Sequence, residues 1–151
     1  IGMFRAAFLG AVVFSMNAYL VVQFPPDPSI SIPLERLLRS TEGFVGFSLF
    51  ALLIAPVSEE IIFRGFIYPV VQRRVGHTAA VIIVTLLFLL PHSLQLGGYW
   101  AGLLYIGLLG LTTGTLRAIT GSILPGYLCH LTYNSLMCIL EIFNRLLLPS
   151  G

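Results

Sequence analysis

Long apolar runs, separated by short polar connections, limit the fold of this chain more than any other feature. Residues 6–22 include no charge, and four further largely apolar runs follow, at 43–72, 78–90, 97–118 and from Pro125 onward. A run of about 18 or more apolar residues is typical of a helix that crosses a membrane, because in lipid a helix satisfies its own backbone hydrogen bonds. The pattern predicts an all-α, multi-pass transmembrane helix bundle with about five membrane segments.

The composition leads to the same class of protein. Hydrophobic residues make up 57% of the chain, charged residues 9%, and the mean hydropathy is +0.96. Soluble domains carry about 25% charged residues, so this chain has too few to cover a water-facing surface. The formal net charge is only +2 and no basic stripe occurs, which argues against a nucleic-acid partner. We expect an integral, multi-pass membrane protein whose partner is the lipid bilayer, with the plasma membrane of a bacterium as the favoured location.

The chain divides into two expected parts. Three prolines between residues 25 and 28 end the first apolar helix, and residues 32–39 read as a short amphipathic segment at the membrane interface. We therefore expect an N-terminal membrane helix plus interfacial loop at 1–42 and a single helical bundle at 43–148. Because the chain begins with Ile1 rather than Met, we also expect a fragment or a processed form.

Three charged residues interrupt the second apolar run, and they are the strongest functional signal in the sequence. Glu59, Glu60 and Arg64 lie within six residues, although a charge at mid-bilayer costs about 3 kcal/mol on insertion scales. Glu60 and Arg64 stand four apart in the order that favours a helical ion pair. Glu59 is turned about 100° away from Glu60 and has no partner in its own segment, so it is a candidate general base. The alternative from these residues alone is a polar cluster that only joins helices.

Two other predicted helices carry polar side chains that share a face. Phe88 and His92 are four residues apart at the end of one run. His130 and Asn134 have the same spacing in the last run. Such groups are costly in lipid unless they find polar partners. We expect one polar cavity, lined by these side chains: Glu59, His92, His130 and Asn134.

Proline and glycine positions predict features of shape. Pro56 precedes the acidic residues and predicts a bend, because it removes a backbone hydrogen bond. Two glycine pairs in the run at 97–118 have the spacing that lets helices approach closely, which predicts a role in packing. They are Gly98 with Gly102 and Gly110 with Gly114.

The polar motifs, taken together, resemble those of a known protease family. Their order along the chain is Glu59-Glu60-x-x-x-Arg64, Phe88-x-x-x-His92 and His130-x-x-x-Asn134. In that order they resemble the three signature motifs of the type II CAAX prenyl endopeptidase and bacteriocin-processing (CPBP) family of intramembrane proteases, also called the abortive-infection (ABI) family. The segment 117–125 is similar to the family's lead-in to its third motif. The likeness covers roughly 43–140, within the expected protease core at 43–148.

The resemblance implies an activity and a set of roles. A water activated by Glu59 would hydrolyse a peptide bond of a membrane-associated protein or peptide, and this substrate class includes prenylated chains. The interpretation requires no cofactor. The resemblance assigns the supporting roles as follows: Glu60 and Arg64 brace Glu59, His92 helps to hold the water, and His130 with Asn134 stabilises the oxyanion.

Two alternatives remain open at the level of the sequence. Glu59, His92 and His130 would make the set of two histidines and one carboxylate that is known from catalytic zinc sites, in a zinc-dependent intramembrane metalloprotease. The chain could instead be a non-catalytic membrane scaffold or immunity protein that keeps the fold and binds a partner in the bilayer. A scaffold is expected to tolerate Glu59→Gln, whereas a protease is not.

Overall fold

The structure, a computed structural model, describes residues 2–27 and 32–147. Every regular element in these two ranges is helical, which confirms the predicted all-α membrane bundle. The elements are α1 (Met3–Gln23), α2 (Pro33–Leu38), α3 (Thr41–Leu49), η1 (Phe50–Ile54), α4 (Ala55–Glu59), η2 (Glu60–Ile67), α5 (Tyr68–Gln95), α6 (Trp100–Thr120) and α7 (Leu124–Leu147), where η marks a π-helix. Ile1, Pro28 and Leu148, which the expectations above include, lie outside the described residues.

Three helices in the described residues are long and apolar enough to cross a membrane. They are Met3–Gln23, Thr41–Gln95 and Trp100–Thr120. The 24 residues of α7 would also be long enough, but polar side chains such as His130 and Asn134 lower its hydropathy, and it is not one of the three. His130 and Asn134 belong to the predicted site.

The stretch Thr41–Gln95 consists of two helical legs that meet at Gly76. Gly76 has φ 79° and ψ 174°, which is not a helical conformation, so the helix is kinked there and the chain turns. Only glycine adopts this backbone conformation without strain. The first leg, 41–75, contains α3, η1, α4, η2 and the start of α5, and the second leg, 77–95, returns beside α6.

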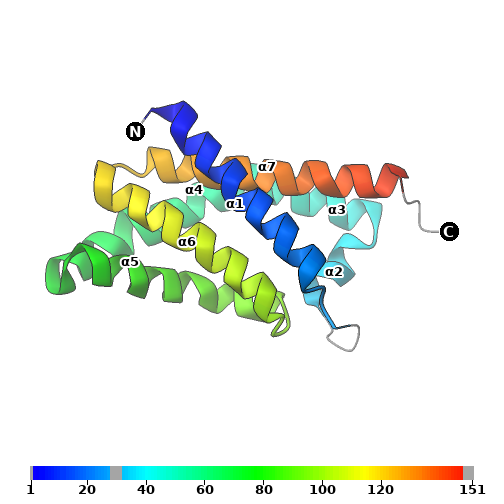
Figure 1. Cartoon of the computed structure of the whole chain (residues 1–151), viewed down its shortest axis with the longest axis horizontal. Coiled ribbons are helices and arrows are strands. Elements are labelled where there is room, and N and C mark those ends of the chain that lie inside the picture. Colours follow the sequence, from blue (N-terminus) through cyan, green and yellow to red (C-terminus); the bar gives the residue numbers. More distant parts are fainter. Residues whose placement is uncertain (1, 28–31, 148–151) are drawn as a thin grey trace.

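α6 lies between α5 and α7 (Figure 1). α1 crosses both α6 and α7, and α5 packs against α6 on another side. η1 and α4 contact α7, while η2 contacts α5 and α6. The segment that carries the acidic residues is therefore in contact with three helices, α5, α6 and α7. The division of the chain at residue 42 stays a prediction, since α1 packs against the same helices that hold this segment.

The glycines of α6 show which predicted packing contacts exist. A Cβ atom at Gly110 would lie 3.0 Å from Thr85, and one at Gly114 would lie 3.2 Å from Val81, both on α5. This pair therefore allows the close approach of α6 and α5. Gly98 precedes α6, has φ 85°, and would place a Cβ atom in open space. The prediction that Gly98 and Gly102 form a helix-packing pair is wrong, because Gly98 serves the connection before the helix.

Candidate active site

The two acidic residues lie at the junction of α4 and η2, in the middle of the first helical leg. η1 and η2 are π-helical: the N–H of Ala55 donates to the Phe50 carbonyl and the N–H of Tyr68 to the Phe63 carbonyl, each five residues back. Such turns are rare and occur frequently at functional sites. Pro56, where the sequence predicts a bend, stands in the first turn of α4 directly after η1. The departure from an α-helix takes the form of a π-helical turn. Glu59 and Glu60 lie next to His130 of α7.

Glu60 and Arg64 form a buried ion pair, as their spacing predicts. Arg64 Nη1 lies 3.1 Å from Glu60 Oε1, and each side chain is 1% exposed. Arg64 Nη2 also donates to the Gly110 carbonyl at 3.0 Å, and the guanidinium lies over the Phe88 ring, 4.6 Å from its centre. These contacts join η2 to α6 and α5. They also compensate a charge that would be strongly destabilising if buried alone.

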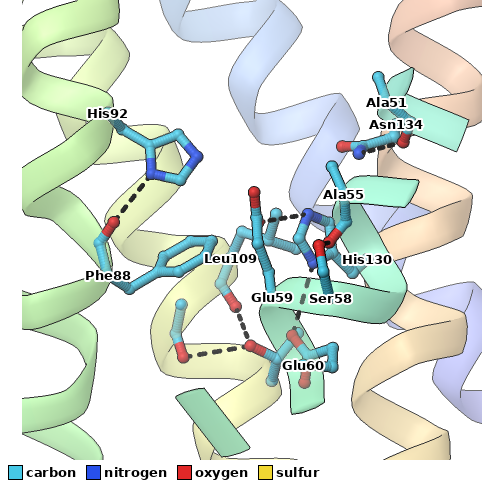
Figure 2. Close-up of polar contacts among 12 residues, drawn as sticks. Ala51, Ala55, Ser58, Glu59, Glu60, Phe88, His92, Leu109, His130 and Asn134 are labelled. Carbon is cyan, nitrogen blue, oxygen red and sulfur yellow. Dashed lines mark hydrogen bonds and ion pairs between the residues drawn. The ribbon is translucent and has the colours of Figure 1, made fainter. Parts of the chain in front are cut away.

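His130 lies between the two carboxylates (Figure 2). Its Nε2 is 3.7 Å from Glu59 Oε2, and its Nδ1 is 3.4 Å from Glu60 Oε1. The imidazole is buried, whereas the Glu59 side chain is 23% exposed. Glu59 is therefore the carboxylate of this cluster that water or a substrate can reach. The structure brings Glu59 and His130 together, as the sequence predicts.

His92 approaches the cluster from α5, beside Phe88. Its Nδ1 bonds the Phe88 carbonyl at 2.8 Å. Because a carbonyl oxygen only accepts, Nδ1 carries the proton, and Nε2 of the neutral ring is an acceptor. The Phe88 ring centre is 4.7 Å from the His92 ring and 6.0 Å from the His130 ring. Figure 2 shows the His92 ring turned toward the part of the site where Glu59 stands.

Asn134 is bonded to the backbone of η1. Its Nδ2 donates to the Ala51 carbonyl at 2.8 Å. The side chain is half-buried and stands one helical turn beyond His130 on α7. An amide group carries two N–H donors, and this bond occupies one of them. The prediction that Asn134 shares one cavity with Glu59 stays a prediction.

Three groups that hold this arrangement together were given no such role by sequence reasoning. A Cβ atom at Gly126 would lie only 2.7 Å from Glu60 Oε2, so α7 touches the carboxylate through its backbone. Arg117 donates from Nε to the Arg64 carbonyl at 3.0 Å. Phe88 lies against both histidine rings and the Arg64 guanidinium. An arginine at the end of an apolar run was the available signal for Arg117, whereas nothing in the sequence distinguishes Gly126 from an ordinary glycine after a turn.

Several buried atoms of the cluster lack a hydrogen-bond partner among residues 2–27 and 32–147. They are Glu59 Oε2, both carboxylate oxygens of Glu60, His130 Nδ1, and Nε and Nη1 of Arg64, although Glu60 Oε1 and Arg64 Nη1 form the ion pair described above. Buried polar atoms are hydrogen-bonded in most proteins, and exceptions gather where chemistry or binding takes place. Because Glu60 is already paired with Arg64, Glu59 Oε2 is the acceptor of this cluster that is available for water or for a polar group of a substrate.

The zinc alternative requires donors that surround one point. Within the described part of the chain, no group of three or more His, Cys, Asp or Glu side chains could hold a metal ion. His92 nevertheless donates from Nδ1 to a backbone carbonyl, which is the arrangement common in metal-binding histidines. The donors fit a metal only if His92 moves toward Glu59 and His130.

Comparison with known proteins identifies the family. The family profile described as type II CAAX prenyl endopeptidase Rce1-like matches residues 41–136. Searches of curated proteins and of solved structures returned no match. The matched region covers more than half of the chain and contains all three polar motifs. The chain therefore belongs to the Rce1-like family of type II CAAX prenyl endopeptidases.

Proposed function

We propose that the chain is an intramembrane endopeptidase that hydrolyses a peptide bond of a membrane-associated substrate with a water activated by Glu59. One observation carries the proposal: a partly exposed carboxylate faces a buried imidazole at 3.7 Å inside an apolar helical bundle. Membership of a protease family supports the same class of reaction. We further propose that the chain crosses the membrane several times, in the plasma membrane of a bacterium.

In this mechanism Glu59 and His92 hold the attacking water. Both the Glu59 carboxylate and Nε2 of neutral His92 are acceptors, so a water with two O–H donors fits between them. The water oxygen attacks the carbonyl carbon of the peptide, and its proton passes to Glu59. Glu59 then gives this proton to the amine nitrogen as the C–N bond breaks, which returns the carboxylate to its starting state.

His130 is the proposed electrostatic partner of the reacting group. Arg64 balances the charge of Glu60, and Glu60 faces Nδ1 of His130 at 3.4 Å. This arrangement directs Nε2 of the same ring toward Glu59 and the substrate. A donor aimed at the developing oxyanion is worth about 2.7 to 4 kcal/mol. An N–H at Nε2 of His130 would donate to the oxyanion as its charge develops.

Asn134 is the second proposed oxyanion donor. One N–H of its amide is bonded to the Ala51 carbonyl, which fixes the orientation of the group. The other N–H is the one proposed to face the oxyanion. A donor held in advance stabilises the transition state without the free-energy cost of reorientation.

A cleavage assay on the purified protein tests the proposed function. Peptides that differ only in a C-terminal prenyl group would be offered in liposomes, because the family acts on prenylated substrates and the proposed substrate is one of them. We expect cleavage that depends on the prenyl group and survives exhaustive chelation, since no cofactor is proposed. Activity that disappears with the chelator and returns with zinc would make Glu59, His92 and His130 metal ligands. Stable binding of either peptide without cleavage would support the scaffold function.

A further inference from the structure

The two π-helical segments end in the same way, although nothing in the motif pattern relates them. The N–H of Ala55 donates to the Phe50 carbonyl, five residues back, and the next residue is Pro56. At the end of η2 the pattern recurs, because the N–H of Tyr68 donates to the Phe63 carbonyl and the next residue is Pro69. Each π-segment is thus followed, one residue after its last donor, by a residue without an N–H group.

This ending leaves one backbone carbonyl in each segment without a donor from its own helix. In η1 it is the carbonyl of Ala51, because the N–H four residues on is bonded to Phe50 and the residue five on is a proline. In η2 it is the carbonyl of Arg64, because the N–H of Tyr68, four residues on, is bonded to Phe63 and the residue five on is Pro69. A backbone carbonyl in an apolar bundle needs a donor from elsewhere, since an unpaired one is strongly unfavourable in lipid.

Both carbonyls receive that donor from a side chain of another helix. Asn134 on α7 donates to Ala51 at 2.8 Å, and Arg117 on α6 donates from Nε to Arg64 at 3.0 Å. The two bonds lie on either side of Glu59 along the chain. The segment that carries the carboxylates is therefore fixed at one end to α7 and at the other to α6.

Arg64 is held by α6 through both its side chain and its backbone. Its Nη2 donates to the Gly110 carbonyl, and its own backbone carbonyl accepts from Nε of Arg117. Both partners, Gly110 and Arg117, belong to α6. Arg117 also donates from Nη1 to the Gly121 carbonyl at the end of α6, and its guanidinium lies 5.9 Å from the centre of the Tyr68 ring. It thereby connects η2 with the turn that leads into α7, the helix of His130.

We propose that Arg117 is a positioning residue of the active site, which fixes the Glu60–Arg64 pair by occupying the Arg64 carbonyl that Pro69 leaves without a helical donor. The role rests on the proposed function, because Arg117 acts through Glu60 and His130 and does not touch the substrate. The proposed role of Arg117 concerns the backbone of η2, so it can also be tested without any measurement of activity.

The structural test uses Pro69→Ala as a compensating change. Alanine at position 69 supplies an N–H group five residues after Arg64, which is the donor spacing of η2. Backbone hydrogen exchange over residues 60–68 would be compared in the wild type, Arg117→Met, and Arg117→Met with Pro69→Ala. We expect faster exchange in Arg117→Met, a melting temperature lower by roughly 5 °C, and recovery of both in the double variant. Arg74→Met, which removes an exposed arginine, is the matched control.

The functional test measures kcat and KM for the same proteins. We expect Arg117→Met to lower kcat by about 10- to 100-fold with KM unchanged, because small misplacement of catalytic groups slows the reaction without loss of substrate contacts. The double variant should recover most of the lost kcat, although it still lacks the arginine charge. A general electrostatic role of Arg117 would not be rescued in this way.

The outcomes separate this inference from the proposed function. If the wild type cleaves no peptide but exchange and melting follow the expected pattern, the backbone role stands and the protease function fails. Unchanged exchange and unchanged kcat in Arg117→Met would overturn the inference, and so would a loss that Pro69→Ala does not relieve. If Arg117→Met does not accumulate as folded protein, recovery of folded protein in the double variant supports the inference and its absence contradicts it.

Discussion

At the scale of single residues, the site depends on the different burial of two adjacent carboxylates. Glu60 is 1% exposed and paired with Arg64, while Glu59 is 23% exposed and faces His130. Removing one member of a buried ion pair leaves the other charge uncompensated, which is far more destabilising than losing an exposed pair. Glu60 is therefore expected to matter for folding, and Glu59 mainly for chemistry.

Glu60→Gln should lower the free energy of unfolding by about 3 to 5 kcal/mol, because it leaves the Arg64 guanidinium buried without a counter-charge. Glu59→Gln should change it much less. Thermal unfolding of both variants in the same detergent checks this difference. Equal melting temperatures would show that the Glu60–Arg64 pair does not stabilise the fold.

Gly126→Ala should displace the Glu60 carboxylate, because the added methyl group would lie 2.7 Å from Oε2 and 3.5 Å from the Thr113 Cβ atom. The carboxylate cannot simply rotate away, since Arg64 holds it from the other side. We expect kcat to fall by about 10-fold or more, as His130 loses its alignment. Gly46→Ala, where a Cβ atom meets nothing within 4 Å, is the control for adding a methyl group to a helix glycine. Normal activity in Gly126→Ala would mean that Glu60 does not orient His130.

At the scale of elements, the sequence predicts the helices well and their internal geometry poorly. Apolar runs and prolines located the five long helical stretches, and the four-residue spacing located the Glu60–Arg64 pair. The π-helical segments could not be predicted, because hydrophobic periodicity does not distinguish donors four residues apart from donors five apart. The contacts of His130 with both acids depend on how α7 packs against α4. The position of α7 along α4 is set by tertiary packing, and no local sequence pattern predicts it.

The turn between the two legs of the second apolar stretch should depend on Gly76. Its φ of 79° with ψ of 174° is accessible almost only to glycine, so Gly76→Ala should lower stability by about 1 to 3 kcal/mol although no atom obstructs the new methyl group. Gly107→Ala, within α6 and in ordinary contact with Leu89 at 3.7 Å, should not be destabilising. Melting temperatures of the two variants give the comparison. An unchanged value for Gly76→Ala would mean that the turn adopts another backbone conformation.

At the scale of the whole molecule, polar contacts tie together the apolar helices that carry the proposed site residues. Asn17 of α1 donates to the hydroxyl of Tyr133 on α7, close to His130. Arg145 near the end of α7 donates to Glu141 at 2.8 Å and to the Leu38 carbonyl. The bonds of Tyr133 with Asn17 and of Arg145 with the Leu38 carbonyl fix α7 relative to α1 and α2, whereas the bond with Glu141 lies within α7. Polar contacts of this kind specify which faces of apolar helices meet. In lipid, an apolar side chain gains little free energy from contact with another helix instead of with lipid tails.

The measurement that most directly tests the account is the turnover of a prenylated peptide by Glu59→Gln in liposomes, beside the wild type and Glu35→Gln. Glu35 is exposed, so the control makes the same chemical change away from the site. The amide of glutamine has nearly the shape of the carboxylate but cannot accept the proton of water. We predict that Glu59→Gln keeps the melting temperature of the wild type and loses about 10²- to 10⁴-fold in kcat, while Glu35→Gln cleaves normally. Turnover by Glu59→Gln at the wild-type rate would contradict the assignment of Glu59 as the base.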